Sequence, residues 1–337
     1  MLPRATKQLL IGLLALPLST LPFVAYAQYT PEGSLLYAKI HAAVVPPQLP
    51  SFDAASAAAM RARAPRWSGQ VAVLVYHGMG ATTAEQTLSI TPERFAEHIA
   101  TMKASGMQPV TAAELAAARN GDGEIPDNAV MVTFDDGRTD SFLWADPVLE
   151  QAGWVATMFV ITSEAAKNSL YYASWDEIAS FARTARWDIE SHSAGMHYEQ
   201  DAAGGQLLPA LTSLQIDDTL GRYQYRIDQD LSESVQAITQ HIGTRPQALA
   251  YPFGAYGAER TNDPRIRRVL AHSVDQRFTL AFEQDNQGSV PLTGCGGDPL
   301  LTRRLEVGDW TGTQLIDRLA RMERQRASGT SEPCPSP

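Results

Sequence analysis

Residues 129–137 read Ala-Val-Met-Val-Thr-Phe-Asp-Asp-Gly, an apolar run of strand length that ends in two adjacent carboxylates and a glycine. Apolar runs of similar length recur along the chain, and segments with the apolar spacing of a helix separate them. This alternation is typical of a parallel sheet or barrel with helices outside it. We therefore predict an α/β fold, an irregular (β/α) barrel of about seven strands in a single domain.

The predicted strands and helices alternate over most of the chain. The strands are residues 71–76, 129–134, 155–160, 187–190, 248–251 and 278–282, with residues 301–307 as a candidate seventh. The helices are residues 91–105, 111–119, 140–152, 174–185, 222–241, 263–274 and 311–321. Thr91 followed by Pro92 is typical of a helix start, because threonine caps the first free N–H groups and proline has none to satisfy.

The N-terminus has the composition of an export signal. Arg4 and Lys7 precede an apolar run over residues 9–16, and residues 25–27, Ala-Tyr-Ala, supply the small side chains of a cleavage site. We predict a signal peptide over residues 1–27 and a periplasmic or secreted protein with no transmembrane span after its removal. A retained anchor helix is the alternative.

The remaining chain divides into three predicted segments. Residues 28–68 are rich in Ala, Pro and Ser and are predicted to form an N-terminal arm or linker. Residues 69–325 form the folded domain, and residues 326–337 form a flexible tail. With only Cys295 and Cys334, the fold does not rest on a disulfide framework, and in an oxidising compartment these two either pair or stay apart.

Polar segments follow four of the predicted strands. They are His77, Asp135-Asp136-Gly137, the loop from His192 to His197, and Pro252-Phe253-Gly254. In parallel barrels the loops after the carboxyl ends of the strands carry the chemistry. Two adjacent carboxylates in such a place need a cation or hydrogen-bond donors, because both favour the ionised form where the dielectric is low. Asp-Asp-Gly is also ordinary turn chemistry, so this motif alone leaves both readings open.

The histidines favour a metal site. His192 and His197 are five residues apart, so on a helix they would point roughly 140° from each other, whereas on a loop they can converge. Two neutral imidazoles and one carboxylate form a three-ligand site with open positions, as in catalytic zinc centres. A histidine pair by itself is more commonly structural, but beside the Asp135-Asp136 turn the pair is predicted to bind metal.

The whole motif set resembles the polysaccharide deacetylase family, also called the NodB-homology family or carbohydrate esterase family 4. Residues 133–137, Thr-Phe-Asp-Asp-Gly, carry the resemblance together with the His192–His197 loop and Pro252-Phe253-Gly254, and it extends over residues 70–319. Residues 90–95, 105–111 and 174–178 look like the family's connecting helices. The resemblance implies a NodB-homology deacetylase barrel as a single catalytic domain and a metal-dependent N-deacetylase activity.

The resemblance also implies roles for individual residues. Asp135 would be the general base, and Asp136, His192 and His197 would bind one divalent metal ion, Zn²⁺ first, with Co²⁺ or Ni²⁺ as alternatives. The other residues that we place on the oxyanion or substrate side of the site are Pro252, Phe253, Tyr198 and Arg304. The Phe253 N–H is the predicted oxyanion donor and Pro252 is predicted to shape the turn. Tyr198, directly after His197, is predicted to line the cleft.

Two departures from the family pattern leave roles open. Ala250 stands where the family usually has the arginine that steers the base, so Arg303 and Arg304 are candidate substitutes, or else ordinary salt-bridge residues. The family's C-terminal Leu-x-His is matched only by residues 270–272, inside a predicted helix. We therefore predict that His77 is the acid that protonates the leaving amine, because imidazole titrates near neutral pH.

Three details resemble the branch that deacetylates poly-β-1,6-N-acetylglucosamine in biofilms. They are the five-residue histidine spacing, residues 205–231 and the Val75-Tyr76-His77 segment. The expected partners are an N-acetylated polysaccharide and separate exopolysaccharide export machinery, since the chain resembles the single-domain members. The net charge of −10 argues against nucleic acid. Deacetylation of peptidoglycan, chitin-like oligomers or another exopolysaccharide, and a catalytically silent carbohydrate-binding relative, remain open alternatives.

Overall fold

A computed structural model describes residues 45–80, 89–202, 205–284, 290–324 and 332–336. The predicted signal peptide, residues 1–27, and the first part of the predicted arm lie outside these ranges. Every helix in the described ranges is too short or too polar to span a membrane.

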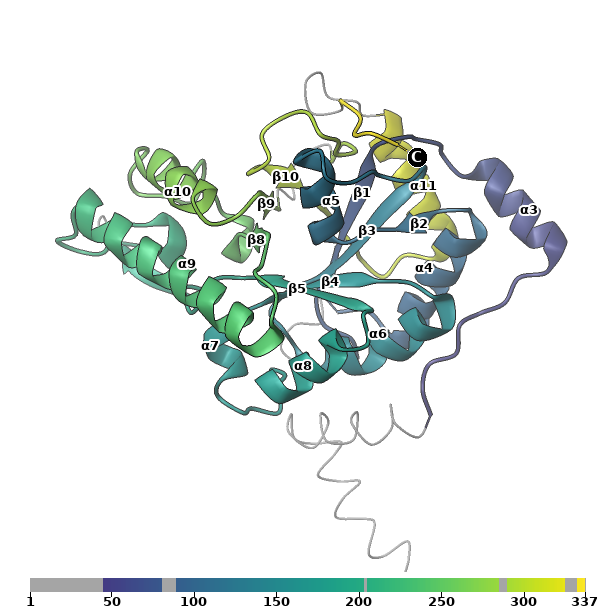
Figure 1. The fold of residues 1–337 in the computed structure, drawn as a ribbon, viewed down its shortest axis with the longest axis horizontal. Helices are drawn as coiled ribbons and strands as arrows, with labels where there is room; N and C mark the ends of the chain where they lie inside the picture. The colour runs from purple at the N-terminus through teal and green to yellow at the C-terminus, as the bar shows by residue number, and fades with distance from the viewer. Residues whose placement is uncertain (1–44, 81–88, 203–204, 285–289, 325–331, 337) are drawn as a thin grey trace, which may run out of the picture.

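Eight strands of the described chain form one continuous parallel sheet. In spatial order they are β10 (Thr302–Arg303), β9 (Leu280–Glu283), β8 (Ala248–Ala250), β5 (Trp187–Ser191), β4 (Ala156–Val160), β3 (Ala129–Phe134), β1 (Val71–Tyr76) and β11 (Leu305–Glu306). A further short strand, β2 (Gln108–Pro109), pairs with β3 outside this path. Parallel neighbours need long crossover connections, and here helices supply most of them around the sheet (Figure 1).

The candidate seventh strand over residues 301–307 is two strands instead of one. β10 pairs with β9 at one end of the path, β11 pairs with β1 at the other end, and only Arg304 separates them. Residues 302–306 therefore supply both end strands of the path, and the sheet is nearly closed. This arrangement confirms the predicted irregular (β/α) barrel.

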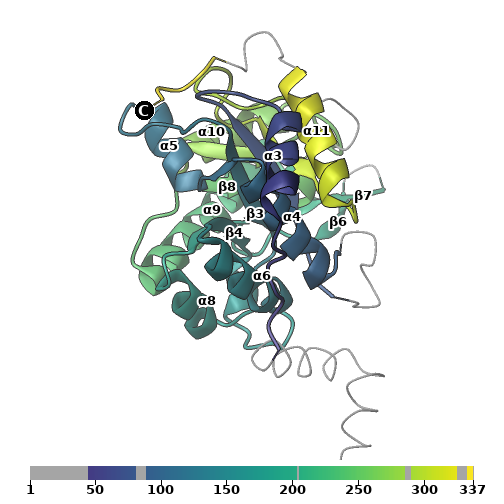
Figure 2. The same cartoon turned by 90° about the vertical axis from the view of Figure 1, so that its right-hand side faces the viewer.

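The predicted helices are present with small shifts at their ends. They are α4 (Pro92–Ala104), α5 (Ala112–Arg119), α6 (Thr139–Ala152), α8 (Trp175–Ala182), α9 (Leu220–Ile242), α10 (Ile266–Asp275) and α11 (Gly312–Arg324). Thr91 caps α4 by accepting the Arg94 N–H, as the Thr-Pro sequence predicts. Figure 2 shows α11 and α4 side by side with α3 on the same flank of the molecule.

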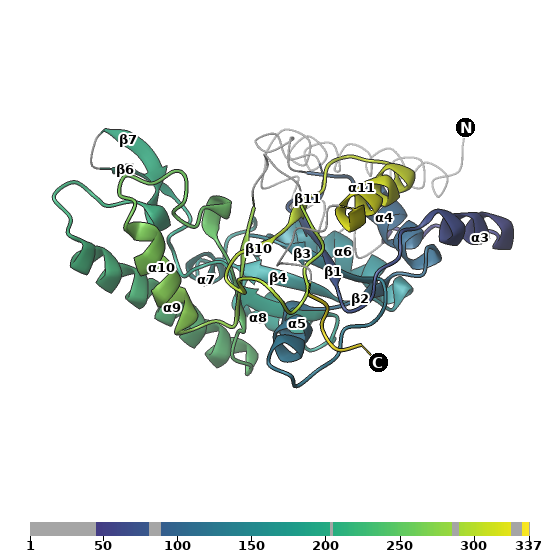
Figure 3. The same ribbon diagram turned by 90° about the horizontal axis from the view of Figure 1, so that it is seen from above.

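Several short elements have no counterpart among the predicted ones. They are α3 (Ala54–Arg63), α7 (Thr162–Ala165), the hairpin of β6 (Glu199–Ala202) and β7 (Gln206–Pro209), and the 3₁₀ turns η1 (Ala210–Thr212) and η2 (Pro252–Gly254). Helix α3 lies inside the predicted arm and packs against α4. None of its residues is buried, so its sequence lacks the apolar stripe that predicts a helix. The hairpin lies at the end of the molecule that α9 occupies, far from α3 (Figure 3).

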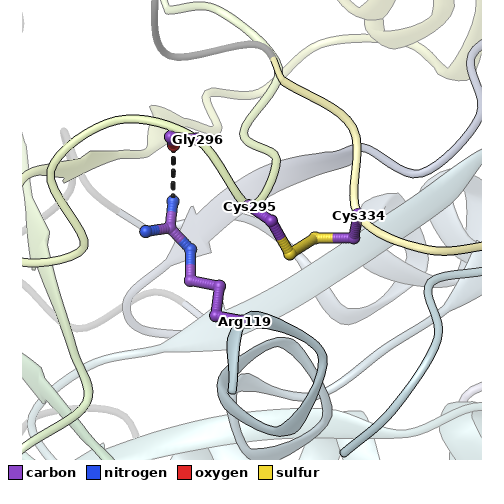
Figure 4. The surroundings of a disulfide bond; sticks show 4 residues. All are labelled: Arg119, Cys295, Gly296 and Cys334. Carbon is purple, nitrogen blue, oxygen red and sulfur yellow. Dashed lines mark hydrogen bonds between the residues drawn. A yellow bond between two sulfur atoms is a disulfide. The ribbon is translucent and has the colours of Figure 1, made fainter. Parts of the chain in front are cut away.

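A disulfide and backbone hydrogen bonds hold residues 332–336 of the C-terminal tail against the domain. Cys334 forms a disulfide with Cys295 (Figure 4). The Cys334 N–H donates to the Gly69 carbonyl at 2.7 Å, and the Cys295 N–H donates to the Glu332 carbonyl at 2.8 Å. A Cβ atom at Gly69 or Gly294 would collide with the tail backbone, so glycine is needed for this close approach. Residues 332–336 of the predicted flexible tail thus pack against the domain, and the two cysteines pair.

Alternate side chains of β5 point to opposite faces of the sheet. Trp187 and Ile189 join the apolar layer between the sheet and helices such as α6 and α8. The buried Glu190 carboxyl accepts the N–H groups of Gln247 and Ala248 at 2.8 and 2.7 Å. Burial, and then the charge of Asp188, raise the pKa of Glu190 well above its ordinary value. The fold therefore favours the protonated form of Glu190 over its ionised form.

Replacement of Glu190 by glutamine is expected to stabilise the protein at alkaline pH and to have little effect near pH 4. A raised pKa means that the folded state keeps a proton that the unfolded state loses, so wild-type stability falls as the pH rises above the unfolded value. The loss is up to about 1.4 kcal/mol per pH unit until the folded pKa is passed. Urea unfolding of both proteins from pH 4 to pH 9 measures it, with the exposed Glu233→Gln as the control. Parallel stability curves for wild type and E190Q would contradict the prediction.

Candidate active site

The loops after β1, β3, β5 and β8 surround one cavity of about 280 Å³. All the residues predicted to do catalysis or bind metal line it. The lining residues are His77, Asp135, Asp136, His192, His197, Phe253, Gly254, Arg260, Gln284 and Glu306. The carboxyl ends of parallel strands lie at one end of the barrel, which is why segments far apart in the sequence meet there.

Three of these side chains converge as a metal site requires. Oδ1 of Asp136 lies 3.5 Å from Nε2 of His192 and 3.5 Å from Nε2 of His197. All three ligand atoms lie within 4.8 Å of one another, and no other group of this kind exists in the described part of the chain. One carboxylate oxygen and two imidazole nitrogens suit a divalent transition metal.

His192 is oriented by the strand beside it. Its Nδ1 lies 2.8 Å from the Ala250 carbonyl, so Nδ1 carries the proton and Nε2 keeps its lone pair for a ligand bond. Burial lowers the pKa of His192 to about 3, which keeps the ring neutral. Ala250, where the family usually has arginine, thus acts here through its backbone oxygen.

The backbone is unusual at several of these loops. Asp136, Ser193 and Phe253 have positive φ angles of 73°, 72° and 58°, in the left-handed region that side chains other than glycine rarely adopt. Such conformations cost of order 1–3 kcal/mol each and cluster at functional sites. Their presence after β3, β5 and β8 is independent support for a site at this end of the barrel.

Asp135 is held by a buried, bidentate ion pair with Arg304. Nη1 and Nη2 of Arg304 donate to the two carboxylate oxygens at 2.6 and 2.7 Å, and the exposed fractions of the two side chains are 0% and 3%. Burial alone would raise the pKa of Asp135, but the charge and hydrogen bonds of Arg304, together with the nearby His192 and His77, outweigh burial and hold the pKa well below its ordinary range. Asp135 is therefore an ionised, fixed carboxylate that lies 4.0 Å from His192 Nε2.

The two adjacent arginines have different surroundings. Arg303 donates to Glu283 at 2.8 Å and is partly exposed, so it forms an ordinary strand-end ion pair. Arg304 is fully buried against Asp135 and does not line the cavity, so it does not occupy the predicted substrate-side position. Since β10 ends at Arg303 and β11 begins at Leu305, Arg304 belongs to neither ladder and its side chain reaches Asp135.

His77 lines the cavity at the end of β1, and α6 holds its loop. The Ser141 hydroxyl donates to the His77 carbonyl at 2.7 Å, and the Met79 N–H donates to Asp140 at 3.3 Å. Asp140 is itself paired with the buried Arg138. His272, the only match to the family's C-terminal motif, lies in the last turn of α10 beside Gln276 and does not line the cavity.

Of the predicted substrate-side residues Pro252, Phe253 and Tyr198, only Phe253 lines the cavity. Phe253 is 38% exposed and its ring stacks on that of His197, with ring centroids 4.6 Å apart. Pro252 is buried and begins the turn that carries Phe253. Tyr198 is 45% exposed and is not among the residues that line the cavity.

Three residues that line the cavity are not predicted from the sequence, namely Gln284, Glu306 and Arg260. Gln284 donates to Glu306 at 2.7 Å, and its side-chain oxygen lies 3.5 Å from Arg304. Arg260 lies over the Phe253 ring at 5.4 Å. None of the three belongs to a motif, and the one available signal was that Glu306 falls in a predicted strand near Arg304.

One family of known proteins matches the part of the chain that carries most of these residues. Residues 122–265 match the family model described as polysaccharide deacetylase. These residues are therefore similar to a polysaccharide deacetylase domain. The matched residues include Asp135, Asp136, His192, His197 and the Pro252 turn, so the family resemblance of the sequence is confirmed.

Curated proteins similar to this chain include enzymes named for their polymer. The poly-β-1,6-N-acetyl-D-glucosamine N-deacetylase of Escherichia coli K12 is 24% identical over 250 residues, which are 67% of this chain and 36% of that protein. The chain thus spans about a third of the length of that relative. The putative polysaccharide deacetylase YxkH of Bacillus subtilis is 30% identical over 188 residues, which are 56% of this chain and 58% of that protein.

Solved structures share the fold of this chain. A de-N-acetylase from Aggregatibacter actinomycetemcomitans superposes with a TM-score of 0.63 at 22% identity, over 74% of this chain and 99% of that one. IcaB from Ammonifex degensii does so with a TM-score of 0.57 at 21% identity, over 74% and 97% of the two chains.

Proposed function

We propose that this protein is a metal-dependent hydrolase that removes N-acetyl groups from an exported amino-sugar polysaccharide, namely poly-β-1,6-N-acetylglucosamine. One observation carries the proposal. The potential ligand atoms of Asp136, His192 and His197 converge in the same cavity as Asp135, an ionised carboxylate whose oxygens both bind Arg304. A site that only bound sugar would need hydrogen-bonding and stacking groups but no such set.

Asp136, His192 and His197 are the proposed ligands of the divalent ion. The donor set suits Zn²⁺ first, with Co²⁺ and Ni²⁺ as alternatives. When bound, the ion would polarise the acetamide carbonyl and lower the pKa of a water molecule.

The remaining steps belong to residues of the chain. Asp135 accepts a proton from water as the water oxygen bonds to the acetamide carbon, and the Phe253 N–H is the proposed donor to the carbonyl oxygen that becomes negative. His77 then protonates the nitrogen, the carbon–nitrogen bond breaks, and acetic acid and the free amino sugar leave. Arg304 keeps Asp135 ionised and oriented for the first step.

The choice of polymer is supported by the relatives named for poly-β-1,6-N-acetyl-D-glucosamine, and by the five-residue histidine spacing. The cavity of about 280 Å³ is small, so most of a polymer must lie outside it. We propose periplasmic or extracellular action on the exported chain, next to separate export machinery.

Chelation is expected to stop acetate release, and added Zn²⁺ or Co²⁺ is expected to restore it. Without an ion the water and the acetamide lose their main activation, so the rate should fall at least about 10²-fold. The measurement is acetate released from poly-β-1,6-N-acetylglucosamine, from chitin oligomers and from peptidoglycan, each with and without chelator. Release that resists chelation would contradict the mechanism. If only another polymer released acetate, that polymer would be the substrate instead of poly-β-1,6-N-acetylglucosamine. If none of the polymers released acetate, the result would favour a catalytically silent carbohydrate-binding protein.

A further inference from the structure

The loop that joins the two proposed histidine ligands belongs to no strand or helix. It consists of residues 193–196 and begins with the positive φ of Ser193. On one side, its carbonyl groups are satisfied by α7, because Ser193 accepts the Thr162 N–H at 3.3 Å and Ala194 accepts the Ser163 N–H at 2.9 Å. The N–H groups on its other side need acceptors from elsewhere in the fold.

Asp230 on α9 supplies those acceptors. Its Oδ2 accepts the Ala194 N–H at 3.0 Å and its Oδ1 accepts the Gly195 N–H at 2.8 Å. Only 7% of Asp230 is exposed, so these charge-assisted bonds lie in a region of low dielectric, where they are strong. A carboxylate from a helix some 35 residues later in the chain thus binds two successive amides of the loop.

The two histidines depend on this loop to different degrees. His192 directly follows β5, is 2% exposed and is fixed by its bond to Ala250. His197 lies beyond the loop, is 24% exposed and has its ring stacked on the exposed Phe253. The position of His197 relative to His192 is therefore set by the path of residues 193–196.

We infer that Asp230 is a positioning residue for metal binding, which fixes loop 193–196 and thereby holds His197 at ligand distance from His192 and Asp136. The inference rests on the proposed function, because it assumes that these three residues bind the ion. Nothing in the sequence marks Asp230, since it is one acid among several on a long amphipathic helix.

The test is the metal affinity of the full chain with Asp230→Asn. Asparagine has the same shape as aspartate, but it carries no charge, and an NH₂ donor replaces one of the two acceptor oxygens. Competition between the metal-free protein and a chromophoric chelator for Co²⁺ should give a Kd about 10–100-fold weaker than wild type. The matched control is Asp228→Asn, on the same helix and paired with Arg277 at 2.9 Å, which should stay within about twofold of wild type.

A double-variant cycle separates positioning from a general structural role. If Asp230 acts through His197, then D230N should weaken Co²⁺ binding in the wild-type background but not in the H197A background. An equal loss in both backgrounds would overturn the inference, as would an unchanged Kd in folded D230N. Loss of the cooperative thermal transition in metal-free D230N would overturn it too, because Asp230 would then support the whole fold. If the wild-type protein binds no Co²⁺ or Zn²⁺, the proposed function itself fails.

Discussion

Asp135→Asn is expected to lower kcat for acetate release by about 10²–10⁴-fold while the protein still binds its metal ion. Asparagine cannot accept the proton of the attacking water, whereas the proposed ligands Asp136, His192 and His197 are unchanged. The measurements are kcat on the acetylated polymer and the bound metal per chain. Asp309→Asn is the control, because this exposed acid pairs with Arg94 away from the cavity.

The ion pair between Asp135 and Arg304 means that D135N also affects stability, and a double variant can separate this effect from the loss of the base. D135N leaves the Arg304 charge buried without its partner, which costs about 3–5 kcal/mol in proteins of this kind. The double variant Asp135→Asn/Arg304→Met removes both charges and should recover much of the lost stability without any activity. Loss of activity in D135N that this recovery reversed would mean that Asp135 acts through the fold rather than as the base.

Arg304→Met alone is expected to lower the free energy of unfolding by about 3–5 kcal/mol. The Asp135 carboxylate, 3% exposed at its side chain, would lose the guanidinium that bonds both of its oxygens. Acetate release should fall with it, because the base is then neither oriented nor held ionised by a neighbouring positive charge. Urea unfolding of the metal-free protein and kcat are the two measurements.

The neighbouring arginine is the matched control for this prediction. Arg303 is 39% exposed and bonds Glu283, so Arg303→Met should have a much smaller effect on both quantities. Arg304→Lys keeps the charge but loses the bidentate geometry, and an intermediate effect is expected. Equal losses in R303M and R304M would contradict the assignment of Arg304 as the residue that positions the base.

Local patterns predicted the barrel well. β1 and β3 coincide with the predicted strands 71–76 and 129–134, because an apolar run bounded by turn residues indicates a buried strand. The elements that were not predicted lack such a pattern in their sequences. Helix α3 buries none of its residues, and the β6–β7 hairpin alternates too briefly to stand out.

The amino-acid sequence by itself determined the longer strands of the barrel and the reactive side chains that follow them, since burial and turn chemistry are read from adjacent residues. Only the tertiary structure decided which side chains meet. Arg304 lies 169 residues from Asp135, and of two equivalent arginines it reaches the base because the chain passes there from one end strand of the barrel to the other. Barrel closure and helix packing are properties of the whole chain, so no local pattern encodes the partners that they bring together.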